Sequence, residues 1–483
     1  MGPIGGLLQR IGVGFDRLLL CLQRYVSASA SRRFGTCGRL GESRHRPLQS
    51  ARKEDEPIKG SFFCVVQKWS TRGFWCIIRC EVTEAKARVS HPVHQKPIRE
   101  GNIVNAKEKY QSLLVGPIER FDQRNDMFRR ARYDPVWRER AKRYYGPAQG
   151  QDRAGYTQED YALRNGAWYV ERFFAMGIYG SNLMGLYAWE CPDPRRARLP
   201  LDARIEVSDP AEVSRKIKRA ARFFGASLVG ICELDRRWVY SHVSNDITGE
   251  HTPLEIPEEY RYAIVMAIEM DYRLIRTSPA GGAAAATGLG YSKMAFVAGL
   301  LAQFIRGLGY KAIPCGNDTA LSIPIAIEAG LGELGRNGLL ITEKFGPRVR
   351  LCKVFTDLPL VPDEPYFFGV DDFCRQCMKC AQDCPSRAIS FGGKTTEALN
   401  ISNNPGVLKW PVNGEQCYKY WLANRMDCAN CIRVCPFNKE EGWLHDLVRL
   451  GVKNAPWLAP LFVWLDGVLG YGRQPDPATI WDG

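Results

Sequence analysis

Eight cysteines near the C-terminus form two runs that restrict what this chain can fold into. The first run is C-x2-C-x2-C-x3-C-P, and the second is C-x10-C-x2-C-x3-C-P. Three thiolates within a short triplet, joined by a fourth from elsewhere in the chain, form the ligand set of a [4Fe–4S] cluster. Paired zinc sites are the weaker interpretation, because zinc prefers two separated C-x2-4-C pairs. The two runs therefore predict an electron-transfer protein.

The spacing also predicts which cysteines share a cluster. In two-cluster ferredoxins the fourth cysteine of each run binds the other cluster. We therefore assign the first cluster to Cys374, Cys377, Cys380 and Cys435. The second cluster falls to Cys417, Cys428, Cys431 and Cys384. The remaining cysteines show no disulfide framework, and a zinc site at Cys76, Cys80, His91 and His94 stays a weaker alternative.

The first 104 residues differ in composition from the rest of the chain. They hold 18 Lys and Arg against 8 Asp and Glu, which is +10 of the net charge of +14. Nucleic-acid binders concentrate basic charge on the functional fold, so we do not expect a nucleic-acid partner. Residues 7–28 could form an amphipathic helix. Arg32-Arg33-Phe34 resembles half of a twin-arginine export signal, but the apolar segment that should follow is missing.

From residue 105 onward the pattern is that of a folded α/β (α+β) protein. A basic helix from residue 211 precedes an apolar strand at 227–232, further strands are expected at 260–268 and 310–314, and 294–308 has helical periodicity. This alternation predicts a mostly parallel sheet. No uninterrupted apolar stretch reaches the roughly 18 residues of a membrane-spanning helix. The tail after residue 445 is broken by Pro456 and Pro460, so short helices packed on the body are expected.

A glycine-rich segment raises the alternative of a dinucleotide site. Residues 330–335 match G-x-G-x-x-G. The expected helix Ile323–Glu328 precedes the motif where a strand is required, and no acidic ribose partner follows about 20 residues on. NAD binding is therefore not expected.

Several motifs together resemble those of the corrinoid-dependent reductive dehalogenases, over residues 105–483. They are Gly290-Tyr291-Ser292, the Ala329–Gly338 segment AGLGELGRNG, Gly346-Pro347-Arg348-Val349-Arg350, the two cysteine runs, and Gly470-Tyr471-Gly472 with Trp481 near the end. The resemblance implies a nitroreductase-like cobalamin-binding core at 105–365. It also implies a bacterial two-[4Fe–4S] ferredoxin-like domain at 366–445 and an apolar tail at 446–483.

The resemblance assigns roles to individual residues. Tyr291 would donate the proton, Arg350 would lower its pKa, and Asn317 would complete the polar wall. Thr287 and Trp421 would line the substrate pocket. The corrin would lie against Gly330, Gly332, Gly335 and Asn337, with 390–416 near its nucleotide. The cobalamin is expected base-off, because none of the six histidines lies in a D-x-H-x-x-G motif.

The implied reaction replaces a carbon–halogen bond by carbon–hydrogen, as in organohalide respiration. The implied partners are an organohalide, an electron-donor protein or quinol-linked chain, and a small membrane-anchor subunit. An epoxyqueuosine reductase, which modifies tRNA, and a non-catalytic electron carrier remain alternatives. Family members are usually exported by the twin-arginine route and associate with the membrane. A cytoplasmic, unexported form of this protein is one alternative. The other is that residues 1–104 come from a wrongly assigned start codon or a frameshift, and we favour this second interpretation.

Overall fold

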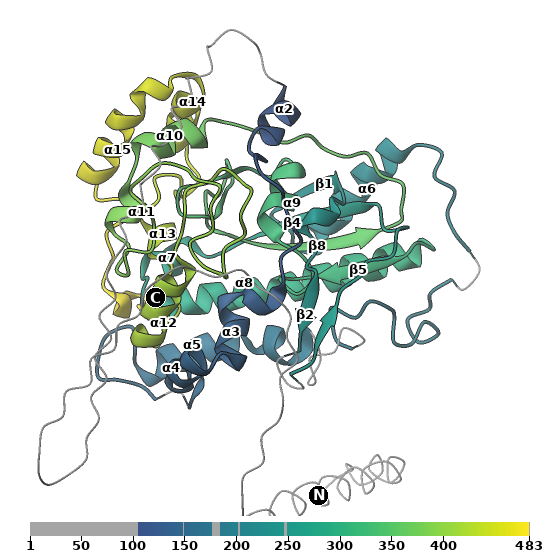
Figure 1. The fold of residues 1–483 in the computed structure, drawn as a ribbon, viewed down its shortest axis with the longest axis horizontal. Coiled ribbons are helices and arrows are strands. Elements are labelled where there is room, and N and C mark those ends of the chain that lie inside the picture. Colours follow the sequence, from purple (N-terminus) through teal and green to yellow (C-terminus); the bar gives the residue numbers. More distant parts are fainter. Residues whose placement is uncertain (1–104, 148, 176–183, 201–202, 246–248, 483) are drawn as a thin grey trace, which may run out of the picture. The chain divides into compact units, whose positions relative to one another are not determined.

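The computed structural model describes residues 105–482, apart from 148, 176–183, 201–202 and 246–248 (Figure 1). The predicted amphipathic helix at 7–28 and the alternative zinc site therefore lie outside the described residues. The chain from Arg99 to Gly483 forms one compact unit. The boundaries at 365 and 445 within this unit stay predictions.

The centre of this unit is a four-stranded sheet in the order β1-β4-β8-β5, in which every neighbouring pair is antiparallel. Its strands are β1 (Leu228–Glu233), β4 (Tyr262–Glu269), β5 (Ala312–Cys315) and β8 (Val349–Thr356). The prediction of a mostly parallel sheet is wrong. In the described part of the connection between β1 and β4, the chain forms η3 (Arg236–Trp238) and the hairpin of β2 (His242–Ser244) and β3 (His251–Pro253), and no α-helix. Without a crossover helix the two strands pair antiparallel.

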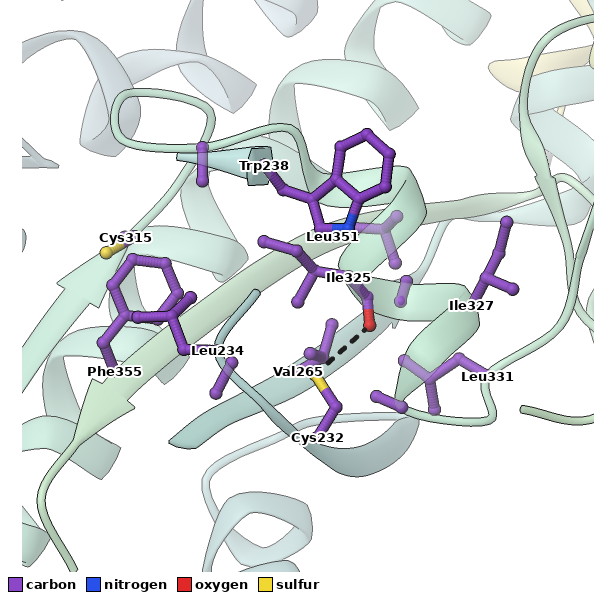
Figure 2. Close-up of a cluster of buried hydrophobic side chains, with 14 of the residues drawn as sticks. Cys232, Leu234, Trp238, Val265, Cys315, Ile325, Ile327, Leu331, Leu351 and Phe355 are labelled. Atoms are coloured by element: carbon purple, nitrogen blue, oxygen red, sulfur yellow. Dashed lines mark hydrogen bonds between the residues drawn. The ribbon is translucent and has the colours of Figure 1, made fainter. Parts of the chain in front are cut away.

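Each face of the sheet buries its own apolar layer. One layer joins Val265, Leu351 and Phe355 to Trp238 and to α9 (Ser322–Glu328), as Figure 2 shows. The other joins Ile264, Met266 and Val354 to α6 (Pro210–Phe223) and α8 (Gly281–Gly307). Because side chains alternate along a strand, β8 sends consecutive residues to opposite layers.

Helix α8 is longer than the sequence pattern predicts, since the Ala- and Gly-rich segment from Gly281 is its first half. By length and composition it could cross a membrane, but 56% of its most apolar window is buried within the protein. It packs against β8, β5 and α5 (Gln158–Ala167), as expected of a core helix. Its small residues allow this close packing: a Cβ on Gly290 would lie 2.9 Å from Arg350 Cγ.

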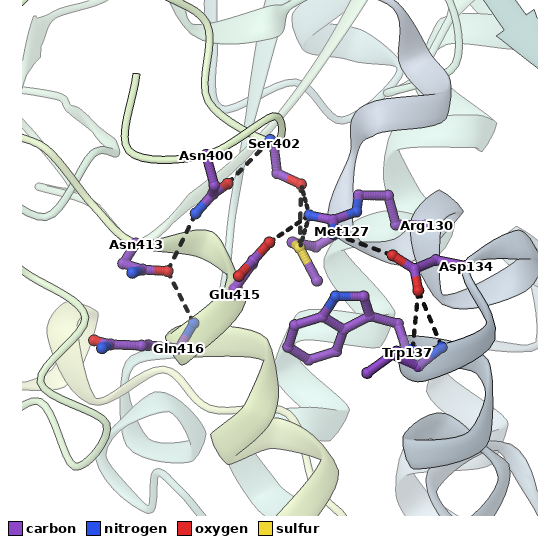
Figure 3. Close-up of polar contacts among 10 residues, drawn as sticks. Met127, Arg130, Asp134, Trp137, Asn400, Ser402, Asn413, Glu415 and Gln416 are labelled. Atoms are coloured by element: carbon purple, nitrogen blue, oxygen red, sulfur yellow. Dashed lines mark hydrogen bonds and ion pairs between the residues drawn. The ribbon is translucent and has the colours of Figure 1, made fainter. Parts of the chain in front are cut away.

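The segment from Asn105 to Gly146 contains several short helices. It forms α2 (Ala106–Gln111), η1 (Gln123–Asn125), α3 (Met127–Tyr133) and α4 (Pro135–Tyr145). Asp134 ends α3 and caps α4, with Pro135 at the first helical position, so the chain turns there. From α3, Arg130 donates to Glu415 at 2.7 Å and to Ser402 at 3.0 Å, which ties these helices to the cysteine-rich region (Figure 3).

The cysteine-rich region is made of short helices and loops. The helices are α10 (Val370–Gln376), α11 (Lys379–Gln382), α12 (Gly414–Asn424) and α13 (Asn430–Arg433). The tail forms α14 (Trp443–Asn454), η4 (Pro456–Leu458), α15 (Ala459–Val468) and η5 (Pro477–Ile480). The smaller elements between are η2 (Glu171–Ala175), α7 (Tyr272–Arg276), β6 (Glu333–Leu334) and β7 (Leu340–Ile341). The tail is thus short helices, as predicted. Asp466 on α15 forms ion pairs with Lys379 and Lys439.

Candidate functional site

Four thiols gather where α10 and α11 meet the end of the second cysteine run. Burial raises the pKa of the Cys435 thiol well above its usual value, and its thiol neighbours Cys374, Cys380 and Cys377 raise it further. Cys374, Cys377 and Cys435 also share one buried apolar cluster. These are the four cysteines assigned to the first cluster from their spacing. Buried thiols that raise one another's pKa are poised to bind iron, because a cation favours the thiolate.

The other four thiols gather beside α12 and α13. Burial raises the pKa of Cys431, and the thiols of Cys428, Cys417 and Cys384 act in the same direction. Burial likewise raises the pKa of Cys428 to about 11, with Cys384 adding to it. Cys435 also raises the pKa of Cys431, and Cys431 raises that of Cys380, so the eight thiols lie together and their division into two ligand sets stays a prediction. All eight cysteines are free of disulfides, so their chemistry and placement fit two [4Fe–4S] clusters.

Tyr291 lies on α8 and is hydrogen-bonded to a side chain from the sheet's edge. Asn317 follows β5, and its Nδ2 donates to Tyr291 Oη at 3.1 Å. Ser322 Oγ donates to Asn317 Oδ1 at 3.1 Å and so holds the amide from behind. The predicted pair of Tyr291 and Asn317 is therefore in direct contact.

Arg350 reaches the same place from β8. Its guanidinium carbon lies 4.9 Å from the centroid of the Tyr291 ring, and its Nη2 donates to Thr287 Oγ1 at 3.2 Å. Thr287 precedes Tyr291 by one helical turn on α8, as expected. Arg350 Nε is buried and has no hydrogen-bond partner among the described residues. One donor of the guanidinium is thus left for a bound group.

Trp168 completes the environment of Tyr291, although the sequence did not indicate it. Its ring stacks on Tyr291 at 4.8 Å between centroids and 23° between planes. Trp168 Nε1 donates to Asp427 Oδ2 at 3.3 Å, and Asp427 Oδ1 accepts from Arg164 at 3.0 Å. Asp427 directly precedes Cys428. A chain of direct contacts therefore connects Tyr291 to the residue next to a cluster cysteine.

The pKa of Tyr291 lies above its usual value of 10.0. Burial is the largest cause; Arg350 lowers the pKa, while Glu171, Asp126 and Asp427 raise it. Arg350 therefore acts in the expected direction, but burial outweighs it, so the pKa is raised in total. Loss of hydration disfavours the phenolate more than one cation favours it. The hydroxyl stays protonated at neutral pH, as a proton donor requires.

Trp421 lies on α12, within the cluster formed by α3, α4 and α12, where it packs edge-on to Phe128 at 5.5 Å. The described contacts do not bring it to Tyr291, so its place in a substrate pocket stays a prediction. Its buried indole lies beside the Cys417 thiol, and a side-chain hydrogen bond from Trp421 opposes the rise in the pKa of that thiol. Trp421 therefore contacts a predicted cluster ligand.

The glycines predicted to hold the corrin each approach protein atoms. A Cβ on Gly330, which has φ +73°, would lie 2.5 Å from Glu364 O, and one on Gly332 would lie 2.1 Å from Ile341 O. One on Gly335 would lie 2.8 Å from Asn337 Oδ1. Asn337 Nδ2 donates to the backbone carbonyl of Cys431 at 3.4 Å. These contacts give each residue a packing role, and their role toward a corrin stays a prediction.

A second group of ligand-type side chains lies away from the cysteines. The ligand atoms of Asp122, His242 and His251 lie within 4.8 Å of one another. His251 Nε2 is 2.9 Å from Asp122 Oδ1, and the two imidazole rings stack. A hydrogen-bonded pair that secures the β2–β3 hairpin accounts for this arrangement.

The fold, the eight gathered thiols and the Tyr291 environment are those expected of a redox enzyme that holds iron–sulfur clusters. The family model of the 4Fe-4S dicluster domain matches residues 373–439. The tetrachloroethene reductive dehalogenase of Sulfurospirillum multivorans is 37% identical over 379 residues, which cover 73% of this chain and 75% of that protein. The chain belongs to the reductive dehalogenase family, whose members are oxidoreductases.

Two further comparisons set limits on this similarity. A solved reductive dehalogenase, described in connection with B12-dependent dehalogenation, matches with a TM-score of 0.58 and 25% identity. The match covers 76% of this chain and 49% of the solved one, so this chain spans about half the length of that structure. The epoxyqueuosine reductase of Aliivibrio fischeri is more distant, at 26% identity over 47% of this chain and 67% of that protein.

Proposed function

We propose that this chain is a corrinoid-dependent reductive dehalogenase in which Tyr291 donates the proton. The observation that carries the proposal is the environment of the Tyr291 hydroxyl. It accepts from Asn317, its ring lies beneath Arg350 and against Trp168, and burial keeps it protonated. In the net reaction, a carbon–halogen bond, two electrons and one proton give a carbon–hydrogen bond and a halide ion.

Each part of the chain has a distinct task in this reaction. The clusters held by the eight cysteines would deliver electrons one at a time. The cobalamin, when bound base-off, would supply the reactive metal centre that cleaves the carbon–halogen bond. The Nε donor left unpaired on Arg350 could serve a bound group. Arg350 and Asn317 would stabilise the phenolate that forms when Tyr291 gives up its proton.

The first experiment is halide release by anaerobically purified protein with two full clusters and a bound corrinoid. The substrate panel should hold chlorinated ethenes, chlorophenols and bromophenols, because the name of the Sulfurospirillum relative points to the first and nothing in the sequence separates the others. Release in the wild type that falls at least about 100-fold in Tyr291→Phe supports the proposal.

An outcome without halide release, at full iron and cobalt content, argues against the proposal. Reduction of an epoxyqueuosine-containing tRNA stem loop by the same preparation would then favour the tRNA-modifying alternative. A pure electron carrier would pass electrons equally well with Tyr291→Phe, which separates the third alternative from both enzymes.

We also propose that a membrane-bound subunit docks on the tail and that an electron-donor protein or quinol-linked chain feeds the clusters. The support is an apolar surface on η4 and α15, where Trp457 is 74%, Trp464 61% and Leu469 61% exposed. Large exposed apolar patches mark protein or membrane contacts. Fractionation of the native host tests this: protein found only in the soluble fraction would contradict it and favour the unexported form.

A further inference from the structure

A buried lysine without an acidic partner lies behind the Tyr291 site. Lys353 in β8 has no exposed surface and forms no ion pair with any carboxylate of the described residues. Its Nζ donates to Gly316 O and, at 3.0 Å, to Ser322 Oγ. Burial lowers its pKa, and Cys315, Asp318 and Cys352 act in the opposite direction. Asp318 attracts the ammonium without forming an ion pair with it, and a buried cation whose hydrogen bonds go only to neutral acceptors is costly, so this position calls for an explanation.

Lys353 and Arg350 come from opposite faces of the same strand. Arg350 points toward α8, where it meets Thr287 and Tyr291. Lys353 points toward the N-terminus of α9, whose first residue is Ser322. Asn317 lies in the connection between β5 and α9 and contacts both sides. Hydrogen bonds therefore pass around the end of β5, from the lysine on one face to the tyrosine on the other.

The lysine restricts the directions that the hydrogen bonds of this network can take. A lysine ammonium can only donate, so Ser322 Oγ must accept from it. The single hydroxyl hydrogen of Ser322 is then available for Asn317 Oδ1, at 3.1 Å. With its oxygen engaged there, the amide of Asn317 turns its Nδ2 toward Tyr291 Oη. An asparagine alone could adopt either orientation. A reversed amide would use the second lone pair of Ser322 Oγ and leave the serine hydrogen without this acceptor, so the lysine and serine favour the observed orientation.

The direction matters because Tyr291 has one hydrogen to give. Since Asn317 donates to Tyr291 Oη, the tyrosine hydrogen is not used in this chain of bonds and can point to a substrate. If the amide were reversed, Tyr291 would donate to Asn317 Oδ1 and its hydrogen would be occupied. The same Asn317 donor also favours the phenolate once the proton has left.

We propose that Lys353 and Ser322 are positioning residues that orient the Asn317 amide, so that Tyr291 faces the substrate as a hydrogen-bond donor. The proposal rests on the proposed function for the role of Tyr291, and it adds two residues that do not touch the tyrosine. It assigns the buried lysine a task that its position in an apolar strand does not otherwise explain.

The test is the ionisation of Tyr291 itself, measured in corrinoid-free protein with oxidised clusters. Fluorotyrosine placed only at position 291 reports its pKa by fluorine NMR. Lys353→Met and Ser322→Ala should each raise that pKa by about one unit or more, because the phenolate loses a charge-assisted hydrogen bond. Lys311→Met, which removes an exposed lysine paired with Glu259, should leave the pKa unchanged.

Two comparisons separate positioning from simple electrostatics. Ser322→Ala keeps the lysine charge, so a shift there cannot come from the loss of a distant cation. In an Asn317→Ala background, Lys353→Met should add no further shift, since its effect passes through the amide. An unchanged pKa in Ser322→Ala, or an undiminished shift in the Asn317→Ala background, would overturn the proposal. If Lys353→Met does not fold, judged by its iron content, Ser322→Ala carries the test.

The kinetic readout distinguishes this proposal from the proposed function. In the loaded enzyme both variants should lower kcat about 10-fold or more with little change in KM, because the substrate is still bound but less readily protonated. A shifted pKa in an enzyme that releases no halide would refute the proposed function and leave the positioning network intact. Halide release together with an unshifted pKa would support the proposed function and refute the positioning network.

Discussion

The guanidinium of Arg350 lies over the ring of Tyr291, at 4.9 Å from its centroid, although the two side chains come from a strand and a helix separated by 58 residues of sequence. The contact needs the small residues of α8, because a Cβ on Gly290 would collide with Arg350 Cγ. The Ala- and Gly-rich sequence of α8 therefore has a structural purpose: it lets β8 bring a cation against the proposed proton donor.

Removing this cation should raise the pKa of Tyr291, since Arg350 is the group that lowers it. In Arg350→Met we expect halide release to fall about 100-fold, with the alkaline limb of its pH profile moved to higher pH. Arg350→Lys should retain part of the rate, because the charge remains without the bond to Thr287. Initial rates between pH 6 and 10 measure both effects. Arg273→Met removes an exposed arginine and serves as control; an equal loss there would contradict the interpretation.

The two cluster assignments can be separated by single substitutions. Cys435→Ser should damage the cluster held with Cys374, Cys377 and Cys380, and Cys417→Ser should damage the other. Because an oxygen ligand binds this iron less well than a thiolate, each variant should lose iron from one cluster and keep the other. Iron content and electron paramagnetic resonance after partial reduction report this. Cys191→Ser, outside both groups, should retain all iron.

The sequence predicted the cluster ligands because thiol spacing alone restricts them. It predicted Tyr291, Asn317 and Arg350 only through a family resemblance, since no local pattern links residues that meet by tertiary contact. No pattern in the sequence indicated that Trp168 would contact Tyr291. Lys353 did carry a signal, as a charge among the apolar residues that follow Arg350 in β8, but its meaning depends on Ser322 and Asn317 lying beside it. The direction of the strands could not be predicted, because alternating helices and strands do not specify how each connection crosses the sheet.

The buried ion pair between Arg164 and Asp427 should be the most sensitive polar contact near the site. Its atoms lie 3.0 Å apart, with side chains only 7% and 2% exposed. Asp427→Asn leaves a buried guanidinium without its anion and should lower the free energy of unfolding by about 3–5 kcal/mol. Asp446→Asn removes the partner of Arg449, in a pair whose carboxylate is 66% exposed, and should cost less than about 1 kcal/mol. The midpoints of denaturant unfolding, measured anaerobically, compare the stability of the two variants.

Gly330 allows packing and cofactor roles to be told apart. It has φ +73°, and a Cβ there would lie 2.5 Å from a backbone carbonyl, so Gly330→Ala should destabilise the corrinoid-free protein by about 1–3 kcal/mol. Gly307→Ala is the matched control, since no atom lies within 4 Å of its added Cβ and it lies outside the predicted corrin contacts. The midpoints of denaturant unfolding, measured before and after corrinoid is added, separate the packing role from the cofactor role. A Gly330→Ala protein of normal stability that fails to bind corrinoid would favour the cofactor role.

Glu171 should make stability depend on pH. Burial, with a contribution from Asp318, raises its pKa from 4.5 to about 8, while Tyr187 and Arg129 oppose the shift. Between these values the folded protein holds a proton that the unfolded chain has released. The contribution of Glu171 to stability is therefore fully present below pH 4.5 and is lost as pH rises toward 8, by up to about 1.4 kcal/mol per pH unit.

Glu171→Gln mimics the protonated form at every pH, so its stability relative to the wild type should increase from pH 5 to pH 8. Melting temperatures of the corrinoid-free protein at several pH values measure the difference. Glu259→Gln provides the contrast, because the pKa of this exposed carboxylate is lowered by Lys311 and the group does not titrate in that range. Parallel stability curves for wild type and Glu171→Gln would show that Glu171 is already ionised at pH 5, despite its burial.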